Sequence, residues 1–384
     1  MRVCLAYDCL YPWTVGGAER WYRSLAERLA ADGHEVTYLT RLQWPVDEPP
    51  AIAGVRVIAV SRADELYGPD GNRRVTPPLR FGWGVLRHLL RCGRRYDVVH
   101  LSSFPYFSVL AAAAARRRGR YRLVIDWFEV WSRQYWREYL GPVGGRIGHA
   151  VQRLCARVPQ TALCFSHIHE QRLLDEGLRG PHRVVGGLYA GSLAPPAASP
   201  ADALVVFAGR QIREKHAPAV VAAIARARAR GLDVRGTILG DGPEHPVVLA
   251  QIAAHGLESF VDAPGFVDTA AVDDALLRAL CLLHPSSREG YGLVVVEAAA
   301  HGTPAIVVDG PDNAAVELID PGVNGLVAPS ADPDTLADAI IAVHEAGIGL
   351  RERTCAWFAQ NAERLSLEHS LDAVAASYGA SARA

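Results

Sequence analysis

The chain has 384 residues, of which 50% are hydrophobic and 21% charged, and its formal net charge at pH 7 is −1. This composition excludes a disordered or fibrous protein, and the length is sufficient for two domains with separate cores. No uninterrupted apolar stretch reaches the roughly 18 residues of a membrane-spanning helix, and the first residues resemble a strand more than a signal peptide. We therefore expect a cytoplasmic protein.

The two halves of the chain carry opposite charges. Residues 1–190 contain 27 arginines and 17 acidic residues, a net charge of +10, whereas residues 191–384 contain 13 basic and 24 acidic residues, a net charge of −11. Two interpretations are open. Either both surfaces are simply solvated and attract each other, or the basic half contacts an anionic acceptor or the inner face of a membrane, as a peripheral protein does.

One of the 40 basic residues is a lysine, Lys215, and the others are arginines. A lysine ammonium is a compact charge on a flexible stem, which suits contact with a phosphate oxygen. The alternative is that this lysine lies on a helix surface and has been kept by chance. The seven cysteines form no CxxC pair, so we expect reduced thiols and no metal site.

Apolar strands alternate with helices in the first half of the chain. The predicted strands are Val3–Tyr7, Glu35–Thr40, Val55–Val60, Val98–Leu101, Leu123–Asp126 and Ala162–Phe165. A loop with Gly16-Gly17 follows the first of them, and a helix is predicted from Ala18 to Asp32. This alternation predicts an α/β fold with a doubly wound parallel sheet.

The pattern breaks in a segment rich in Gly, Ala, Pro and Ser and then starts again. The predicted elements are strands at Leu204–Ala208, Val234–Leu239, Leu280–His284, Ala305–Val308 and Gly325–Val327, and helices at Ala217–Arg230, Val247–His255 and Leu336–Ala346. We therefore predict a Rossmann-like domain at 1–187, a linker at 188–203 and a second Rossmann-like domain at 204–360. The two domains would face each other across a cleft at the carboxyl ends of their strands, where ligands of such folds bind.

The pattern Asp332-Pro333-Asp334 resembles a metal-binding D-x-D motif. It directly precedes a predicted helix, and aspartate followed by proline is typical of a helix N-terminus. We therefore assign it to N-capping and assign no metal there.

The segment between Glu289 and Glu297 is the most informative in the sequence. Its glycines, Gly290 and Gly292, allow the backbone to come close to a ligand. The apolar run that follows predicts a helix whose first N–H groups form an anion site. Glu297 lies roughly 7 Å along that helix, about the step from a diphosphate to the ribose behind it. The segment therefore predicts a site for a nucleotide diphosphate and the group attached to it.

Other polar or glycine-rich loops follow the predicted strands of the second half. They are Gly209–Lys215, Gly240-Asp241-Gly242-Pro243, Gly265-Phe266-Val267 and His284-Pro285-Ser286. Each is weak evidence alone. In this order, and together with the Glu289–Glu297 spacing (E-x7-E), they make the chain resemble family four of the retaining glycosyltransferases, which have the two-domain GT-B architecture. The resemblance covers nearly the whole chain, and it implies that the C-terminal helix, in residues 361–384, crosses back to the first domain.

The resemblance implies a role for each matching residue. Arg210 and Lys215 would hold the diphosphate and stabilise its charge as it leaves, and Glu289 would lie against the donor sugar. These three are the expected catalytic residues. The expected donor-binding residues are Gly17, Gly240, Gly242, Phe266, Val267, Gly290, Tyr291, Gly292, Leu293 and Glu297.

The resemblance also implies the reaction. A sugar would pass from a UDP- or GDP-linked donor to the hydroxyl of a small-molecule, glycan or lipid-linked acceptor, with no cofactor other than the nucleotide sugar as co-substrate. The leaving phosphate would take the acceptor proton, so no second carboxylate is needed at the anomeric carbon. No motif supports nucleic-acid binding.

Two positions depart from the family pattern. The family usually has a histidine that touches the donor sugar after the fifth predicted strand, and Phe128 occupies that place here. His100, Asp126 and Glu129 are candidate substitutes. His216 follows the lysine where glycine is common. These departures favour an alternative, a catalytically weakened nucleotide-sugar-binding protein. A nicotinamide oxidoreductase is disfavoured because no G-x-G-x-x-G follows either opening strand.

Six aromatic side chains are concentrated between Trp127 and Tyr139, with Trp131 near the middle. Two interpretations are open for them. The rings form a platform for an acceptor sugar or an apolar aglycone, or they anchor a loop through an amphipathic helix.

Overall fold

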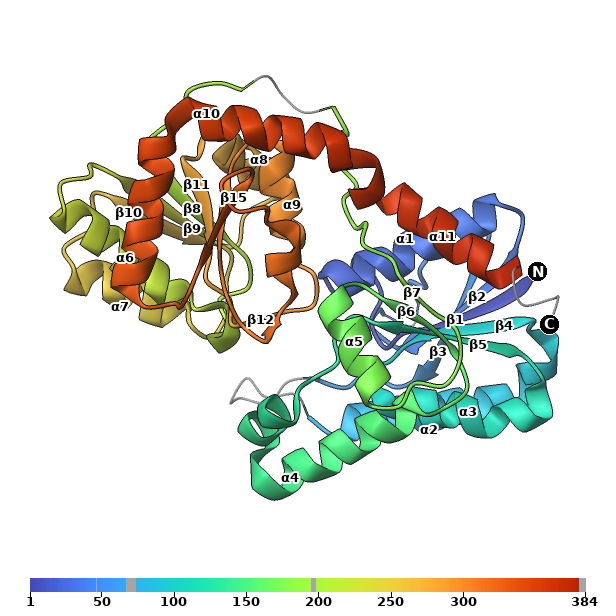
Figure 1. The fold of residues 1–384 in the computed structure, drawn as a ribbon. Helices are drawn as coiled ribbons and strands as arrows, with labels where there is room; N and C mark the ends of the chain where they lie inside the picture. Colours follow the sequence, from blue (N-terminus) through green and yellow to red (C-terminus); the bar gives the residue numbers. More distant parts are fainter. Residues whose placement is uncertain (46, 67–73, 195–197, 380–384) are drawn as a thin grey trace. The chain divides into compact units, whose positions relative to one another are not determined.

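The computed structural model describes residues 1–45, 47–66, 74–194 and 198–379, and the chain forms two compact units (Figure 1). Unit 1 comprises Met1–Gly186 and the C-terminal segment from Ser370, and unit 2 comprises Gly187–His369. Each unit is built on a parallel sheet covered by helices, so the prediction of two Rossmann-like α/β domains is confirmed. Residues 195–197 of the predicted linker and residues 380–384 of the predicted C-terminal segment lie outside the described residues.

The described part of unit 1 contains a seven-stranded parallel sheet in the order β3-β2-β1-β4-β5-β6-β7. The strands are β1 (Arg2–Ala6), β2 (Glu35–Arg41), β3 (Val55–Ser61), β4 (Val98–Ser102), β5 (Arg122–Trp127), β6 (Thr161–Cys164) and β7 (His182–Val184). The central strands are buried on both faces, which explains their uninterrupted apolar sequences. The sequence missed β7, which is three residues long and carries two polar residues.

Helices cover both faces of this sheet. They are α1 (Gly17–Ala31), α2 (Thr76–Cys92), α3 (Tyr106–Gly119), α4 (Arg133–Ala156) and α5 (His167–Asp175), with a short 3-10 turn at Gly93–Arg95. The chain kinks inside α4 at Gly141, where φ is +73°, and Pro142 follows. A residue with φ above zero and a proline both interrupt the helical hydrogen bonds, so α4 consists of two straight segments.

The last helix, α11 (Leu367–Gly379), packs on unit 1 from Ser370 onward. The hydroxyl of Tyr378 lies 2.6 Å from Nδ1 of His100 on β4, and Arg28 of α1 forms an ion pair with Asp372. Tyr378 and His100 are both fully buried. The inner side of α11 is therefore part of the core of unit 1.

The parallel sheet of unit 2, within residues 198–379, has six strands in the order β10-β9-β8-β11-β13-β15. They are β8 (Leu204–Ala208), β9 (Arg235–Leu239), β10 (Val261–Gly265), β11 (Cys281–His284), β13 (Ala305–Val308) and β15 (Gly325–Ala328). The sequence missed β10, which contains Asp262, Pro264 and Gly265. Proline is compatible with this strand because β10 lies at the edge of the sheet.

Unit 2 has two helical layers and a small second ladder. The helices are α6 (Ala217–Ala229), α7 (His245–Ala254), α8 (Thr269–Arg278), α9 (Leu293–Ala300) and α10 (Pro333–Leu365), with 3-10 turns η2 (Arg213–Lys215) and η3 (Ala314–Leu318). The ladder pairs β12 (Arg288–Glu289) with β14 (Asp312–Asn313). One apolar core lies under α6, α7 and the start of α10, and another lies under α8, α9 and the end of α10.

The N-capping role of Asp332 is confirmed. Its carboxylate accepts hydrogen bonds from the backbone N–H of Asp334 at 3.0 Å and of Thr335 at 3.5 Å. The helix that it caps is longer than predicted, because the chain bends at Gly347, where φ is +54°, and continues to Leu365. Residue 361, the expected start of the C-terminal segment, therefore lies inside α10.

None of the described helices combines the length and the apolar composition that crossing a bilayer requires.

We expect Tyr378→Phe to destabilise unit 1 by about 1–3 kcal/mol, because it leaves a buried nitrogen of His100 without its hydrogen-bond partner. Urea unfolding of the full chain measures the change. Tyr11→Phe, at a partly exposed position, is the control and should have little effect. Equal stability of Tyr378→Phe and the wild type would show that the hydrogen bond contributes nothing.

Candidate functional site

Two loops of unit 2 interlock at the carboxyl ends of the neighbouring strands β8 and β9. Gln211 is fully buried, and its Nε2 donates a hydrogen bond of 2.6 Å to the carbonyl oxygen of Gly240. Gly240 has a φ of +111°, and a Cβ at this position would overlap the carbonyl oxygen of Gly209. A Cβ at Gly242 would likewise overlap the carbonyl oxygen of Gln211. Both expected glycines are thus needed for the close approach of the two loops.

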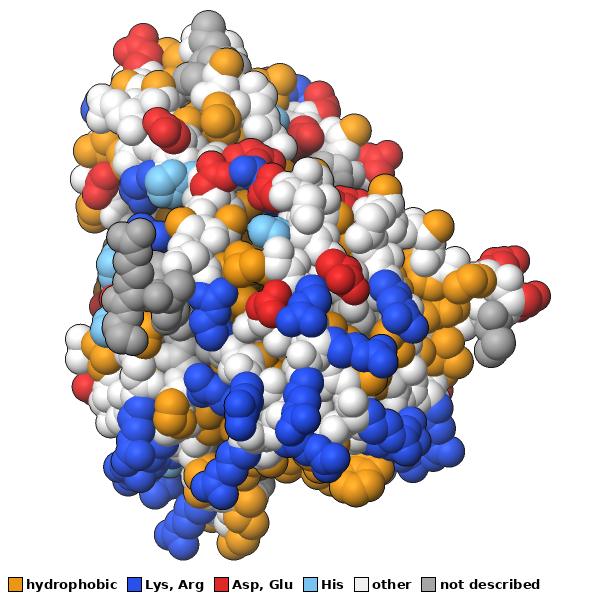
Figure 2. Space-filling model, turned by 90° about the vertical axis from the view of Figure 1, so that its right-hand side faces the viewer, with side chains coloured by type: hydrophobic (Ala, Val, Ile, Leu, Met, Phe, Trp, Pro, Cys, Tyr) orange, Lys and Arg blue, Asp and Glu red, His pale blue; other side chains and the backbone are white. Residues whose placement is uncertain are grey.

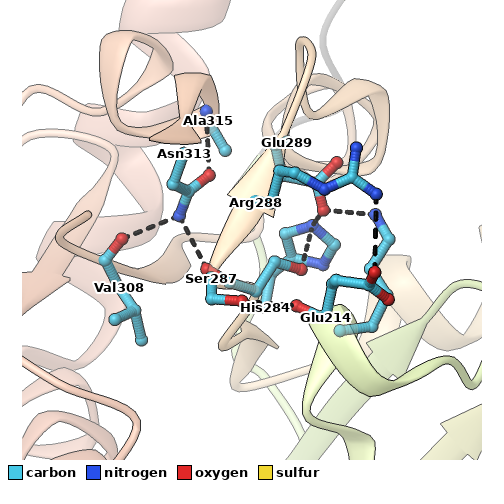
Figure 3. A network of polar contacts seen from close by, with 10 residues as sticks. Glu214, His284, Ser287, Arg288, Glu289, Val308, Asn313 and Ala315 are labelled. Carbon is cyan, nitrogen blue, oxygen red and sulfur yellow. Dashed lines mark hydrogen bonds and ion pairs between the residues drawn. The ribbon is translucent and has the colours of Figure 1, made fainter. Parts of the chain in front are cut away.

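The only lysine lies in the turn that follows the first of these loops, the one after β8. Lys215 ends η2, and its ammonium group donates to Oε1 of Glu289, the last residue of β12. Nε2 of His284, at the end of β11, lies 2.6 Å from the same oxygen (Figure 3). Because β8 and β11 are neighbours in the sheet, the turn after one strand and the end of the other meet at one edge. The sequence missed the pairing of His284 with Glu289, since nothing in the five-residue separation indicates it.

The Glu289 carboxylate keeps its charge although it is nearly buried. Its side chain is 10% exposed and that of Lys215 is 19% exposed. Burial alone would raise the pKa of Glu289, but the Lys215 ammonium and the hydrogen bond from His284 outweigh it and hold the pKa well below its usual range. The carboxylate is therefore ionised, and Nε2 of His284 must carry the hydrogen that it donates.

Other contacts hold this group in place. Nδ2 of Asn313 on β14 donates to the carbonyl oxygens of Ser286, at 3.0 Å, and of Val308, at 2.7 Å (Figure 3). Its Oδ1 accepts from the backbone N–H of Ala315. One buried amide therefore ties the loop before β12 to the end of β13. No feature of the sequence singled Asn313 out.

The helix predicted after the glutamate segment is α9, which begins at Leu293. Gly292 precedes it with a φ of +99°, and an added Cβ would lie 2.7 Å from the Cβ of Ala315. Only glycine fits there without displacing η3. The first N–H groups of α9 have no partner inside the helix. Glu297 lies one turn further along and is partly exposed.

Tyr291 is a core residue. Its side chain is buried among α9, η3 and the sheet, and burial raises the pKa of its hydroxyl. Its position next to Gly290 and Gly292 therefore leaves the backbone as the part that a ligand can reach.

Three further expected site residues lie near the same edge of the sheet. Phe266 follows β10, and its side chain is 75% exposed. Val267 beside it is partly buried. Arg210 follows β8, is exposed, and makes no ion pair with a described residue. Unit 2 thus brings Arg210, Lys215, Glu289, the α9 N-terminus and Phe266 to the carboxyl edge of one sheet. Within residues 198–379, no three His, Cys, Asp or Glu side chains gather to hold a metal ion.

The sugar-side candidates His100 and Asp126 form a closed network inside unit 1. Nε2 of His100 lies 2.7 Å from Oδ1 of Asp126, and Oδ2 of Asp126 accepts from Nε1 of Trp21 at 2.8 Å. Both side chains are fully buried, and the second nitrogen of His100 faces Tyr378. All four polar atoms are used within the unit. The structure therefore gives this pair a structural role, and their inaccessibility argues against a contact with the sugar.

The remaining candidates of unit 1 are more accessible. Phe128 is partly exposed and stacks on Phe165 with ring centroids 4.4 Å apart. Glu129 accepts a hydrogen bond of 2.7 Å from Nε1 of Trp131. Gly17 begins α1, and no atom lies within 4 Å of an added Cβ there. These residues follow β5 and β1, which have only β4 between them in the sheet.

Both interpretations of the aromatic segment have support. Trp127, Tyr135 and Trp136 are buried, and Trp127 and Trp136 belong to the unit 1 core, as an anchoring helix requires. Trp131 is partly exposed, and its ring lies against Tyr139 with centroids 5.2 Å apart. Only some of the six rings are therefore accessible to an acceptor, because Trp127, Tyr135 and Trp136 are buried.

Comparison with known proteins finds relatives over most of the chain. Residues 16–187 match the family model described as a glycosyl transferase 4-like domain, and residues 194–364 match the one described as glycosyl transferases group 1. Glycogen synthase of Mycobacterium tuberculosis is 27% identical over 341 residues, which cover 80% of this chain and 77% of that protein.

Solved structures show the same fold. Sucrose-phosphate synthase from Thermosynechococcus elongatus matches with a TM-score of 0.77 and 19% identity over 99% of this chain and 98% of its own. Anabaena HepE in complex with UDP matches with a TM-score of 0.74 and 18% identity over 99% of this chain and all of its own.

We expect Glu289→Gln to lower the free energy of unfolding by about 2–3 kcal/mol at neutral pH, because the ion pair with Lys215 is lost. The folded-state pKa of Glu289 lies below its unfolded value of about 4.3, so the carboxylate contributes stability above that pH. The difference between wild type and variant should therefore be constant above about pH 5 and decrease as the pH falls below 4.

Chemical denaturation at a series of pH values measures this difference. The control is Glu258→Gln, which removes an exposed carboxylate. A difference that vanished already at neutral pH would contradict the assignment.

Proposed function

Because the chain belongs to the glycosyltransferases of family four, which have the GT-B fold, we propose that it transfers a sugar from a nucleoside diphosphate sugar to an alcohol acceptor, with retention of configuration. One observation carries the proposal. The only lysine of the chain is held beside Glu289, at the sheet edge where Arg210 and the α9 N-terminus also lie. Two cations and a helix N-terminus at one edge suit a diphosphate.

The donor is a UDP- or GDP-linked sugar. The N–H groups at Gly292 and Leu293 bind the diphosphate, and Glu297, one turn along α9, accepts hydrogen bonds from the ribose hydroxyls. The exposed ring of Phe266 offers the base a face to stack on, with Val267 beside it. The similarity to HepE, whose structure contains UDP, supports a nucleotide as part of the donor.

Arg210 and Lys215 stabilise the negative charge that develops on the diphosphate as it leaves. The bond between the anomeric carbon and the phosphate oxygen breaks, and the acceptor oxygen forms the new bond on the same face of the sugar. The acceptor proton passes to the leaving phosphate oxygen, so the reaction requires no second protein base. Because Arg210 and Lys215 neutralise the diphosphate, it also requires no metal ion.

Glu289 lies against the donor sugar and accepts a hydrogen bond from one of its hydroxyls. It does not serve as a nucleophile. Its Oε1 is already shared by Lys215 and His284, which hold its pKa well below the usual range and so reduce the basicity of the carboxylate.

The acceptor is a small molecule, a glycan or a lipid-linked alcohol, and the protein is cytoplasmic or peripheral on the inner membrane face. On unit 1 the partly exposed Phe128, Glu129 and Trp131 are the residues available to the sugar or the acceptor. We propose that they contact the donor sugar or the acceptor.

A second candidate is a nucleotide-sugar-binding protein with weakened catalysis. Phe128 favours it, because a hydrocarbon ring cannot donate a hydrogen bond to the sugar as the usual histidine does. Tight binding of UDP- or GDP-sugars in a thermal-shift screen, with neither hydrolysis nor transfer, would support this candidate.

We expect Lys215→Ala to slow transfer by on the order of 10²-fold or more, because one stabilising charge is removed from the leaving group. Steady-state kinetics with a donor identified by the thermal-shift screen measures the effect. The control Arg213→Ala removes an exposed cation from the same turn and should leave turnover unchanged. Unchanged turnover in Lys215→Ala would refute the role.

We expect Glu297→Gln to weaken nucleotide binding by roughly tenfold, because an amide replaces the charged acceptor of the ribose hydroxyls. Isothermal titration with UDP and GDP measures the affinity. The exposed Glu345→Gln in α10 is the control. An unaltered affinity would show that the ribose lies elsewhere.

A further inference from the structure

The outer face of α2 exposes apolar side chains at helical spacing. They are Val75, just before the helix, and Leu79, Trp83 and Leu90 within it, with Trp83 67% exposed. The opposite face of α2, which carries Phe81, Val85 and Leu89, packs into the core on the sheet. A large exposed tryptophan in such a row marks a contact surface, since exposed apolar side chains are otherwise scattered singly.

The second segment of α4 repeats this arrangement. Val143, Ile147 and Leu154 occupy positions i, i+4 and i+11 and are 69%, 61% and 56% exposed. Cys155 and Ala156, on the other side of the segment, belong to the same core as the inner face of α2. Because α3 contacts both α2 and α4, these helices form one layer on the same side of the sheet (Figure 1). The apolar rows are exposed, so they lie on the side of this layer away from the core. We call this outer side the α2–α4 face.

Basic residues outnumber acidic ones around the α2–α4 face, although Asp64 pairs with Arg80, Glu65 pairs with Arg74, and Glu138 is exposed on the first segment of α4. Between residues 74 and 122 Asp97 is the sole acidic residue, and it pairs with Arg2 at 2.7 Å. The arginines of this stretch are Arg74, Arg80, Arg87, Arg91, Arg94, Arg95, Arg116, Arg117, Arg118, Arg120 and Arg122. Figure 2 shows basic side chains gathered over the lower part of the view, at the height of α2 and α3 in Figure 1.

Several of these cations are available to a partner. Arg87 and Arg91 lie one and two turns after Trp83 on α2, and Arg117 and Arg118 end the neighbouring α3. All four are exposed, and none forms an ion pair with a described residue. Their guanidinium groups can form paired hydrogen bonds with phosphate oxygens.

We propose that the α2–α4 face binds an anionic phospholipid surface. Trp83, Ile147 and their apolar neighbours enter the boundary between headgroups and acyl chains, and the arginines contact lipid phosphates. Apolar rows bordered by basic residues are the pattern of helices that lie in a membrane interface, and each arginine near such a surface contributes about 1 kcal/mol. This inference specifies the peripheral contact in the proposed function but does not depend on the transfer reaction.

The same observations argue against two other partners. A nucleic acid would use the arginines and could stack one base on Trp83, but the aliphatic row of Val143, Ile147 and Leu154 would gain no stacking partner. A second copy of this face would bring two positive surfaces together, which is unfavourable.

Vesicle cosedimentation of the full chain tests the proposal, with phosphatidylcholine vesicles alone and with added phosphatidylglycerol. We expect binding only to the anionic vesicles, and weaker binding as the salt concentration rises. Trp83→Ser combined with Ile147→Ser should reduce the affinity by about tenfold or more. Arg87→Glu combined with Arg91→Glu should reduce it by at least about 25-fold, at roughly fivefold per charge removed.

Matched controls lie on unit 2. Leu249→Ser and Arg235→Glu change an exposed apolar and an exposed basic residue and should leave vesicle binding unchanged. All variants should keep the wild-type unfolding temperature and the response of that temperature to UDP or GDP. Donor hydrolysis in solution should also be unaffected, so failure of vesicle binding is distinct from failure of the proposed reaction.

A second measurement uses the position of one tryptophan. Acyl chains brominated near the headgroup should quench the fluorescence of the bound wild type more than that of Trp83→Phe, which keeps an apolar ring. The proposal is overturned by a wild type that does not bind anionic vesicles, or by binding that the face variants do not change. It is also overturned if the variants abolish only self-association or binding to an oligonucleotide.

Discussion

The candidate site of unit 2 depends on one nearly buried charge, the carboxylate of Glu289. Taking a carboxylate out of water is strongly unfavourable unless partners replace the lost solvation. Lys215 and His284 replace that solvation at a single carboxylate oxygen, the lysine from the turn after β8 and the histidine from the end of β11. The position of the lysine is therefore fixed by the fold before any ligand arrives, and its ammonium group has donors left for a phosphate.

The surrounding backbone is organised to keep this arrangement rigid. Gln211 joins the loops after β8 and β9, and Asn313 joins the loop before β12 to β13, in each case through one buried amide. Gly240 and Gly292 allow approaches that a Cβ would prevent. A preorganised site loses little conformational freedom when charge develops in the reaction, which is the condition under which fixed cations stabilise a leaving group.

Much of the fold follows from the sequence, since continuous apolar strands between amphipathic helices are typical of a parallel sheet. The strands that were missed, β7, β10 and the β12–β14 ladder, are short or contain polar residues, Pro or Gly, so they have no apolar pattern. The glutamate segment and the loops before it were predicted to follow strands, and the structure places them at the ends of β8, β9, β10 and β11, where they form the candidate site of unit 2. The partners of Glu289 and the closed pair of His100 and Asp126 could not be derived, because those contacts depend on side chains that the sheet brings together from distant positions.

The α2–α4 face and the candidate site of unit 2 differ in which basic residue they use. Arginine is planar and weakly hydrated and forms paired hydrogen bonds, so many arginines on one face can contact a dense array of phosphates. The proposed reaction sets a different requirement at the site of unit 2, because there the cation would have to reach past a carboxylate and touch one phosphate oxygen. A guanidinium would form a two-point pair with Glu289 and remain bound to it, whereas an ammonium can share its donors between Glu289 and the ligand. A chain that otherwise uses arginine for every positive charge thus has a physical reason to keep lysine at position 215.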